Sequence, residues 1–103
     1  MKHFLLEGEH LMPFAAVSAR LVDEHHAFLQ RGYDEGHFLF SGPQIPAHGG
    51  FLVARAPSRQ ALDELLAGEP FVREGMMRFS RVTEFDPVQH QDALANWFGG
   101  KRG

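Results

Sequence analysis

Two adjacent histidines, His25 and His26, are the residues of this sequence best placed for acid–base chemistry. A neutral imidazole can take or return a proton near pH 7. Both residues lie in a segment whose apolar residues recur at helical spacing. At about 100° per residue, His25 falls in the apolar sector close to Leu21, and His26 lies about 100° further round. We therefore expect His25 alone to point inward, either as a catalytic base or as a packed core side chain with one hydrogen-bond partner.

The helix that would carry His25 has recognisable ends. It begins somewhere between Pro13, which is acceptable as a first helical residue, and Ser18, a possible N-cap. Gly36 follows the last periodic turn and suits a left-handed cap. Gly32 falls in the apolar sector, where the missing Cβ lets another backbone approach closely. This pattern predicts a helix packed tightly on a sheet.

The remaining elements complete a mixed fold. Short apolar runs bounded by glycine or proline predict strands at residues 2–8, 37–41, 51–56 and 75–85. A second helix is expected with Ser58 as its N-cap and Gly68 at its end, followed by a short connecting turn at residues 69–71. The order β-α-β-β-α-β predicts an α+β, ferredoxin-like fold, in which a four-stranded antiparallel sheet carries two helices on one face.

Apolar residues expected on the sheet face away from the helices indicate the oligomeric state. The apolar residues expected there are Phe4 or Leu5, Phe38 or Leu39, Met77 and Phe79. Nothing in a single chain is left to cover them. We therefore expect a homodimer or a higher homo-oligomer.

The length of 103 residues suits one domain. We expect this domain to span residues 1–86 and to be followed by a tail at residues 87–103. Within the tail, Leu94, Trp97 and Phe98 have helical spacing. A helix this short is marginal by itself in water, so we expect it to dock on this subunit or on a partner.

Composition excludes several classes of function. The net charge of −3 arises from 10 basic and 13 acidic residues without a basic stripe, so we expect no nucleic-acid partner. No segment approaches the roughly 18 apolar residues that span a bilayer, and we expect a soluble, cytoplasmic protein without a membrane partner. The absence of cysteine excludes disulfides, thiolate nucleophiles and cysteine-ligated metals.

Other chemical motifs are weak. The seven histidines have no metal-binding spacing, so we expect no metal, although a cluster formed only by folding is left open. The segment Ser41-Gly42-Pro43 lacks the pattern of a nucleophile elbow, and turn structure is the expected role of Ser41. The glycines form no nucleotide-binding loop.

Three short motifs make the sequence resemble the YCII-related (YciI-like) proteins. They are His25 with Phe28, Leu29 and the helix end at Gly36; Ser41-Gly42-Pro43, whose glycine follows His25 by 17 residues; and Glu69-Pro70-Phe71 with Gly75. The likeness covers residues 2–85. It implies a ferredoxin-like fold of the dimeric α/β-barrel type, with a cleft between sheet and helices near the subunit interface.

The resemblance also implies a catalytic pair. Members typically carry a histidine at the position of His25 and an aspartate before Pro-Phe, where this chain has Glu69. The arginine that is common three residues before the histidine is Val22 here. A carboxylate on one imidazole nitrogen fixes the tautomer and stabilises the imidazolium, and glutamate can do this with a longer reach. The alternative for Glu69 is a solvated residue in a turn.

The best-defined activity associated with this family is removal of HCl from a chlorinated hydroxyhydroquinone without metal or organic cofactor. The resemblance thus implies a lyase of the dehydrochlorinase type, which transfers protons with tautomerisation or elimination on a small phenolic or quinol-like compound. The residues expected around the substrate are Ser41, Gly42, Pro43, Phe28, Phe38 and Met77. The alternative class is a noncatalytic dimeric binding or assembly module. A cleft of several hundred Å³, lined by His25 and Glu69, would favour the enzyme.

Overall fold

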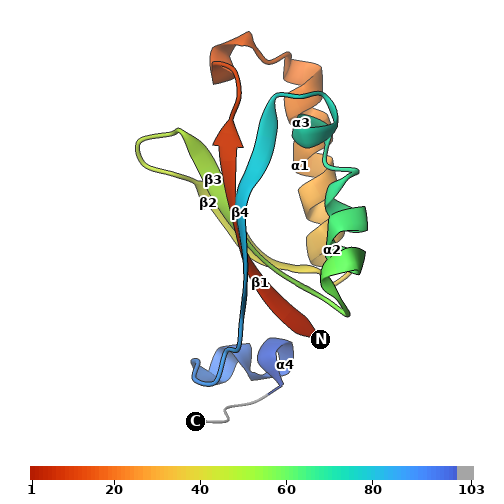
Figure 1. Cartoon of the computed structure of the whole chain (residues 1–103), viewed down its shortest axis with the longest axis vertical. Coiled ribbons are helices and arrows are strands. Elements are labelled where there is room, and N and C mark those ends of the chain that lie inside the picture. Colours follow the sequence, from red (N-terminus) through yellow and green to blue (C-terminus); the bar gives the residue numbers. More distant parts are fainter. Residues whose placement is uncertain (100–103) are drawn as a thin grey trace.

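The computed structural model describes residues 1–99. Its elements are β1 (Lys2–His10), the 3₁₀ turn η1 (Phe14–Ala16), α1 (Ala19–Asp34), β2 (Phe38–Pro43), β3 (Gly49–Ala56), α2 (Arg59–Leu66), α3 (Pro70–Arg73), β4 (Met77–Phe85), the 3₁₀ turn η2 (Asp92–Leu94) and α4 (Ala95–Phe98). The four strands form one antiparallel sheet in the order β2-β3-β1-β4. Helices α1, α2 and α3 lie on one face of this sheet (Figure 1). The predicted ferredoxin-like α+β fold is confirmed.

Helix α1 forms as its sequence signals predict. Ser18 is the N-cap, and its Oγ accepts a hydrogen bond of 3.2 Å from the backbone N–H of Leu21. After the helix, Gly36 has a φ of +79°, which a residue with a Cβ rarely adopts. A Cβ built on Gly32 would lie 2.1 Å from the ring of Phe38 on β2. The close approach of helix and sheet therefore depends on glycine at this position.

Several predicted boundaries are corrected by the structure. β1 continues past Gly8 to His10, and β2 runs through Pro43. β2 is an edge strand, where a residue without an N–H is tolerated because only one side of the strand is paired. The predicted turn at residues 69–71 is instead the start of the short helix α3. One helical turn is too short to show a helical period in the sequence.

The main core lies between the sheet and the helices. Its buried members include Phe4, Leu6, Phe28, Phe38, Leu52, Leu62 and Leu66. Met77 and Phe79 also face the helices, where they pack against Phe71 of α3. The prediction that these two residues lie on the open face is wrong, because the register of β1 against β4 shifts between Glu7 and Gly8.

The open face carries a different apolar set. Phe4 and Leu6 point to the helices, so the alternating residue Leu5 points away from them. Leu5 pairs with Val53, which in turn pairs with Phe40. These three residues, from β1, β3 and β2, lie side by side on the open face.

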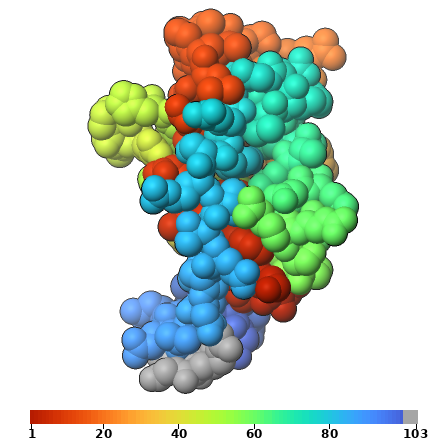
Figure 2. Space-filling view, in the orientation of Figure 1, coloured from red at the N-terminus to blue at the C-terminus, as the bar shows by residue number. Residues whose placement is uncertain are grey.

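The tail after β4 folds back on one end of the sheet. The rings of Trp97 and Phe98 each lie 5.2 Å from the ring of His3 on β1. Nη1 of Arg55 donates a hydrogen bond of 2.9 Å to the carbonyl of Trp97, and its guanidinium lies 4.8 Å from the Trp97 ring centre. Figure 2 shows the tail as a distinct mass at the end of the sheet. Residues 100–103 of the predicted tail lie outside the described residues.

Within residues 1–99, no helix has both the length and the apolar character that crossing a bilayer requires.

Candidate active site

His25 and Glu69 lie side by side in the folded chain. His25 is on α1 and Glu69 is the N-cap of α3, yet His25 Nδ1 and Glu69 Oε1 are 2.6 Å apart. Glu69 is 1% exposed and the His25 side chain is 17% exposed. An ionised carboxylate only accepts hydrogen bonds, so a neutral imidazole paired with it carries its proton on Nδ1 and keeps a lone pair on Nε2.

The second oxygen of Glu69 holds the carboxylate in place. Oε2 accepts a hydrogen bond of 3.2 Å from the backbone N–H of Val72 in the first turn of α3. Pro70 stands in this turn, where its missing N–H leaves no donor unsatisfied. Glu69 is therefore not a solvated turn residue, because its side chain caps a helix and faces His25.

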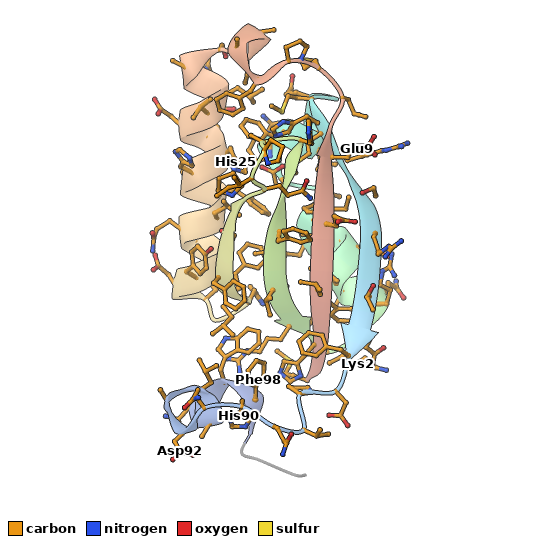
Figure 3. The ribbon with its side chains drawn as sticks, turned by 90° about the vertical axis from the view of Figure 1, so that its left-hand side faces the viewer. Lys2, Glu9, His25, His90, Asp92 and Phe98 are labelled. Carbon is orange, nitrogen blue, oxygen red and sulfur yellow. The ribbon has the colours of Figure 1, made fainter. Side chains whose placement is uncertain are left out.

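Phe71 fixes the plane of the imidazole. Its ring is stacked on that of His25, with centres 3.9 Å apart and planes 9° from parallel. Within the described chain, His25 Nε2 has no hydrogen-bond partner. The histidine is thus held by a carboxylate at one nitrogen and an aromatic face, while its other nitrogen is available. Figure 3 shows His25 on α1, at the side that borders the sheet.

An exposed ion pair also ties α3 to α1 next to this site. Nη2 of Arg73 is 3.2 Å from Oε2 of Glu24, the residue before His25. The pKa of Arg73 is raised above its ordinary value, mainly by the hydrogen bond with Glu74. Desolvation is the next largest effect and lowers this pKa, and the hydrogen bond with Glu24 raises it further. The pair keeps the two helices that carry the dyad alongside one another.

A cavity of about 580 Å³ opens between the helices and the sheet. The predicted site residues that border it are His25, Glu69, Ser41, Gly42, Pro43 and Met77. The Ser41 hydroxyl is hydrogen bonded to the hydroxyl of Tyr33 on α1. The structure therefore brings the predicted dyad, the end of β2 and the start of β4 together around one space.

The other two predicted substrate contacts lie elsewhere. Phe28 and Phe38 are buried in the main core, with ring centres 6.0 Å apart, and neither borders the cavity. Phe38 fills the space above Gly32 that holds α1 close to the sheet. Their expected role as substrate contacts is therefore corrected to core packing.

The cavity is also bordered by residues that were not expected there, among them His10, Phe14 and His26. His10, at the end of β1, shares the inward face of that strand with Gly8, and Phe14 of η1 stands next to it. Extending the alternation of Phe4 and Leu6 by four residues would have found His10. His26 also borders the cavity, contrary to the expectation that His25 alone points inward, because the opening reaches the exposed edge of α1.

Charge and donor types restrict what the cavity can bind. No lysine or arginine is among the described residues that border it. In residues 1–99, no three histidine, aspartate or glutamate side chains lie close enough together to hold a metal ion. The arrangement offers an imidazole base in apolar and aromatic surroundings.

Fold and site together define a small ferredoxin-like α+β domain with a histidine–carboxylate pair in a cleft between sheet and helices. The YCII-related domain model matches residues 3–86, and the chain belongs to this family. A search of curated proteins found no matching relative.

Solved structures with the same fold include three enzymes, each 18% identical to this chain. The 5-chloro-2-hydroxyhydroquinone dehydrochlorinase from Burkholderia phenoliruptrix AC1100, in complex with 2,5-dihydroxybenzoquinone, has a TM-score of 0.56 over 88% of this chain and 97% of its own. A muconolactone isomerase has a TM-score of 0.63 over 87% and 92%. An antibiotic biosynthesis monooxygenase has a TM-score of 0.54 over 84% and 99%. At this identity the likeness establishes the fold.

Proposed function

We propose that this protein is a small-molecule enzyme in which His25 and Glu69 transfer protons on a phenolic or quinol-like ring, with tautomerisation or loss of HCl. The observation that carries the proposal is the 2.6 Å contact between His25 and Glu69 at the wall of a cavity of about 580 Å³. A buried carboxylate that orients an imidazole is the arrangement that general acid–base catalysis uses.

The chemistry can be written with these two residues. Nε2 of His25 takes the proton of a ring hydroxyl, and the imidazolium returns it to the ring carbon that bears chlorine, which gives the keto tautomer. Loss of the proton of a second hydroxyl then expels chloride with its bonding electrons and leaves a quinone. One proton and one chloride are released. The ring's own electrons drive the step, so no outside oxidant is required.

The environment of the site supports this class of substrate. Phe71, Met77 and Phe79 border the cavity and suit a flat ring. The dehydrochlorinase and the isomerase with this fold act on small molecules, as their names state, and the former is in complex with a dihydroxybenzoquinone. We carry the substrate class over as part of the proposal.

The alternative function is a noncatalytic dimeric binding or assembly module. It predicts a closed core around His25. An open cavity of several hundred Å³ with the dyad in its wall instead favours the enzyme.

The test compares His25→Ala with the matched control His26→Ala. Chloride release from chlorinated hydroxyhydroquinones is followed under anaerobic conditions, and circular dichroism checks that each variant is folded. Loss of a positioned base should lower kcat about 10²–10⁴-fold in His25→Ala. His26→Ala should lose far less activity than His25→Ala, because the exposed His26 ring borders the cavity but has no carboxylate partner in the described chain. A folded His25→Ala that turns over substrate at the wild-type rate would contradict the dyad and favour the module.

We also propose that the chain forms a homodimer through the open face of the sheet. Leu5, Phe40 and Phe51 lie on this face and are at least two-fifths exposed in the single chain. Apolar groups gathered on one face of a sheet suit contact with a second copy.

A further inference from the structure

His10, which borders the cavity as His25 and His26 do, has a backbone that is fixed on both sides. It is the last residue of β1 and pairs with Met77 on β4. Its N–H donates a hydrogen bond of 3.0 Å to the carbonyl of His48, and the N–H of Leu11 donates one of 2.7 Å to the carbonyl of Met76. A side chain on such a backbone is held in a defined position at the cavity wall.

The His10 ring is available to a ligand. It is half-buried, borders the cavity and makes no hydrogen bond to another described residue. Two other polar side chains of the cavity are already occupied, since the Ser41 hydroxyl is bonded to Tyr33 and Glu69 uses both of its oxygens. His26 also borders the cavity, but it lies on the exposed edge of α1. A half-buried imidazole without a partner gains a hydrogen bond when a polar ligand group arrives.

His10 and His25 stand at different places in the cavity. His25 stacks on Phe71, Phe71 meets Phe14 edge-on at 6.3 Å, and Phe14 lies 6.0 Å from His10. The two imidazoles therefore stand at the two ends of one row of ring contacts, and all four rings border the cavity. One imidazole belongs to the helical wall and the other to the sheet.

The cavity beside this row of rings suits a flat, uncharged ring. Gly8 and Gly50 face each other across β1 and β3, so neither adds a side chain to the sheet wall of the cavity. The side chain of Met77 lies over Gly8, where an added Cβ would be 2.9 Å from its sulfur. No lysine or arginine among the described cavity residues could bind a phosphate or carboxylate.

We infer that His10 is a second ligand-binding residue, and that the cavity takes an aromatic ring with oxygen atoms on two opposite sides, one held at His25 and the other at His10. This inference rests on the proposed function and names its substrate class more closely. A neutral imidazole at His10 can accept from a ring hydroxyl or donate to a ring carbonyl, so it serves both a quinol and a quinone. It binds and orients the ring, while proton transfer stays with His25.

The test uses 2-methylhydroquinone, which has two opposite oxygens and cannot lose HCl, and 3-methylphenol, which lacks one of them. Dissociation constants are measured anaerobically by NMR titration of the histidine ring signals. The single hydroxyl of 3-methylphenol should go to His25, whose Nε2 is the stronger acceptor because Glu69 supports it. The wild type should therefore bind the hydroquinone about tenfold more tightly.

Two variants test the proposed hydrogen bond between His10 and the ligand: His10→Phe removes it, and His10→Gln keeps it in part. His10→Phe should weaken hydroquinone binding about tenfold and change phenol binding less than twofold, and His10→Gln should restore part of the difference. The matched control is His48→Ala, an exposed histidine whose backbone carbonyl, and not its ring, contacts His10. It should bind both probes as the wild type does.

The outcomes separate this inference from the proposed function. Equal binding of the two probes by the wild type, binding of neither probe, or a folded His10→Phe with unchanged affinities would overturn the role of His10. The proposed function is decided separately by chloride release in His25→Ala. If His10→Phe no longer distinguishes the two probes while His25→Ala releases chloride at the wild-type rate, the ligand contact at His10 is supported and the role of His25 as the base is rejected.

Discussion

Glu69 uses its two carboxylate oxygens for different tasks, one for structure and one for the imidazole. Oε2 caps α3 at Val72, and Oε1 accepts the hydrogen bond of His25 Nδ1. An amide has a single acceptor oxygen. Glutamine at this position could therefore serve one of these donors only.

Glu69→Gln should consequently lower kcat about 10–100-fold, which is less than the loss in His25→Ala, because the base remains and only its orientation and charge support are lost. Steady-state kinetics of both variants with the same chlorinated substrate measures this order. Glu64→Gln, on the exposed side of α2, is the matched control and should leave the rate unchanged. Equal losses in Glu69→Gln and His25→Ala would contradict a supporting role for the carboxylate.

At the residue scale, the inward orientation of His25 could be predicted from the sequence. Helical phase predicted that His25 points inward with Leu21, and His25 borders the cavity together with Val22 and Leu29 of the same helix. The burial of Glu69 was not readable, because it depends on α3 folding under α1 and a single helical turn has no period to detect. The likeness to a known family supplied this pairing, whereas composition and spacing could not.

At the scale of elements, the packing of α1 on β2 depends on Gly32. Its missing Cβ leaves room for the ring of Phe38, 2.1 Å from where a Cβ would stand. Gly32→Ala should destabilise the fold by about 1–2 kcal/mol, since overpacking costs about 1–3 kcal/mol and the better helix propensity of alanine returns up to about 1 kcal/mol. The free energy of unfolding in urea measures the change.

Gly42→Ala is the control for this substitution. A Cβ at Gly42 would meet nothing within 4 Å, so stability should change by less than about 0.5 kcal/mol. If Gly32→Ala were as stable as the wild type, the helix could shift without cost and the close approach would not hold α1 in place.

Strand boundaries limited what the sequence could predict about the cavity. Gly8 was expected to end β1, but Gly8 pairs with Gly50 and the strand goes on to His10. Glycine weakens a strand by its backbone entropy, and only the partner strand decides whether pairing continues. Phe28 and Phe38 were likewise predicted at the cavity, and only the packing of α1 on the sheet shows that they belong to the core. Order of elements and helix caps were predictable from local chemistry, whereas strand register was not.

At the scale of the whole molecule, the open face of the sheet divides into two regions. The tail covers one region through Trp97, which contacts His3 and Arg55. The other region is uncovered in the single chain and holds Leu5, Phe40 and Phe51, which are 41%, 56% and 40% exposed. The proposed contact with a second copy therefore belongs to this uncovered region. The view in Figure 3 looks onto this face, with the tail below it.

Phe40→Asp tests the proposed dimer at its most exposed apolar residue. Phe40 pairs with Val53 next to Leu5, so a carboxylate there would have to lose its water inside an apolar contact, which is strongly unfavourable. Light scattering at micromolar concentration should give the wild type twice the 11.6 kDa of one chain, and Phe40→Asp the mass of one chain. Ala27→Asp, which adds the same charge on the exposed side of α1, should remain a dimer. A wild type of 11.6 kDa would reject the dimer, and a dimeric Phe40→Asp would place the interface on another surface.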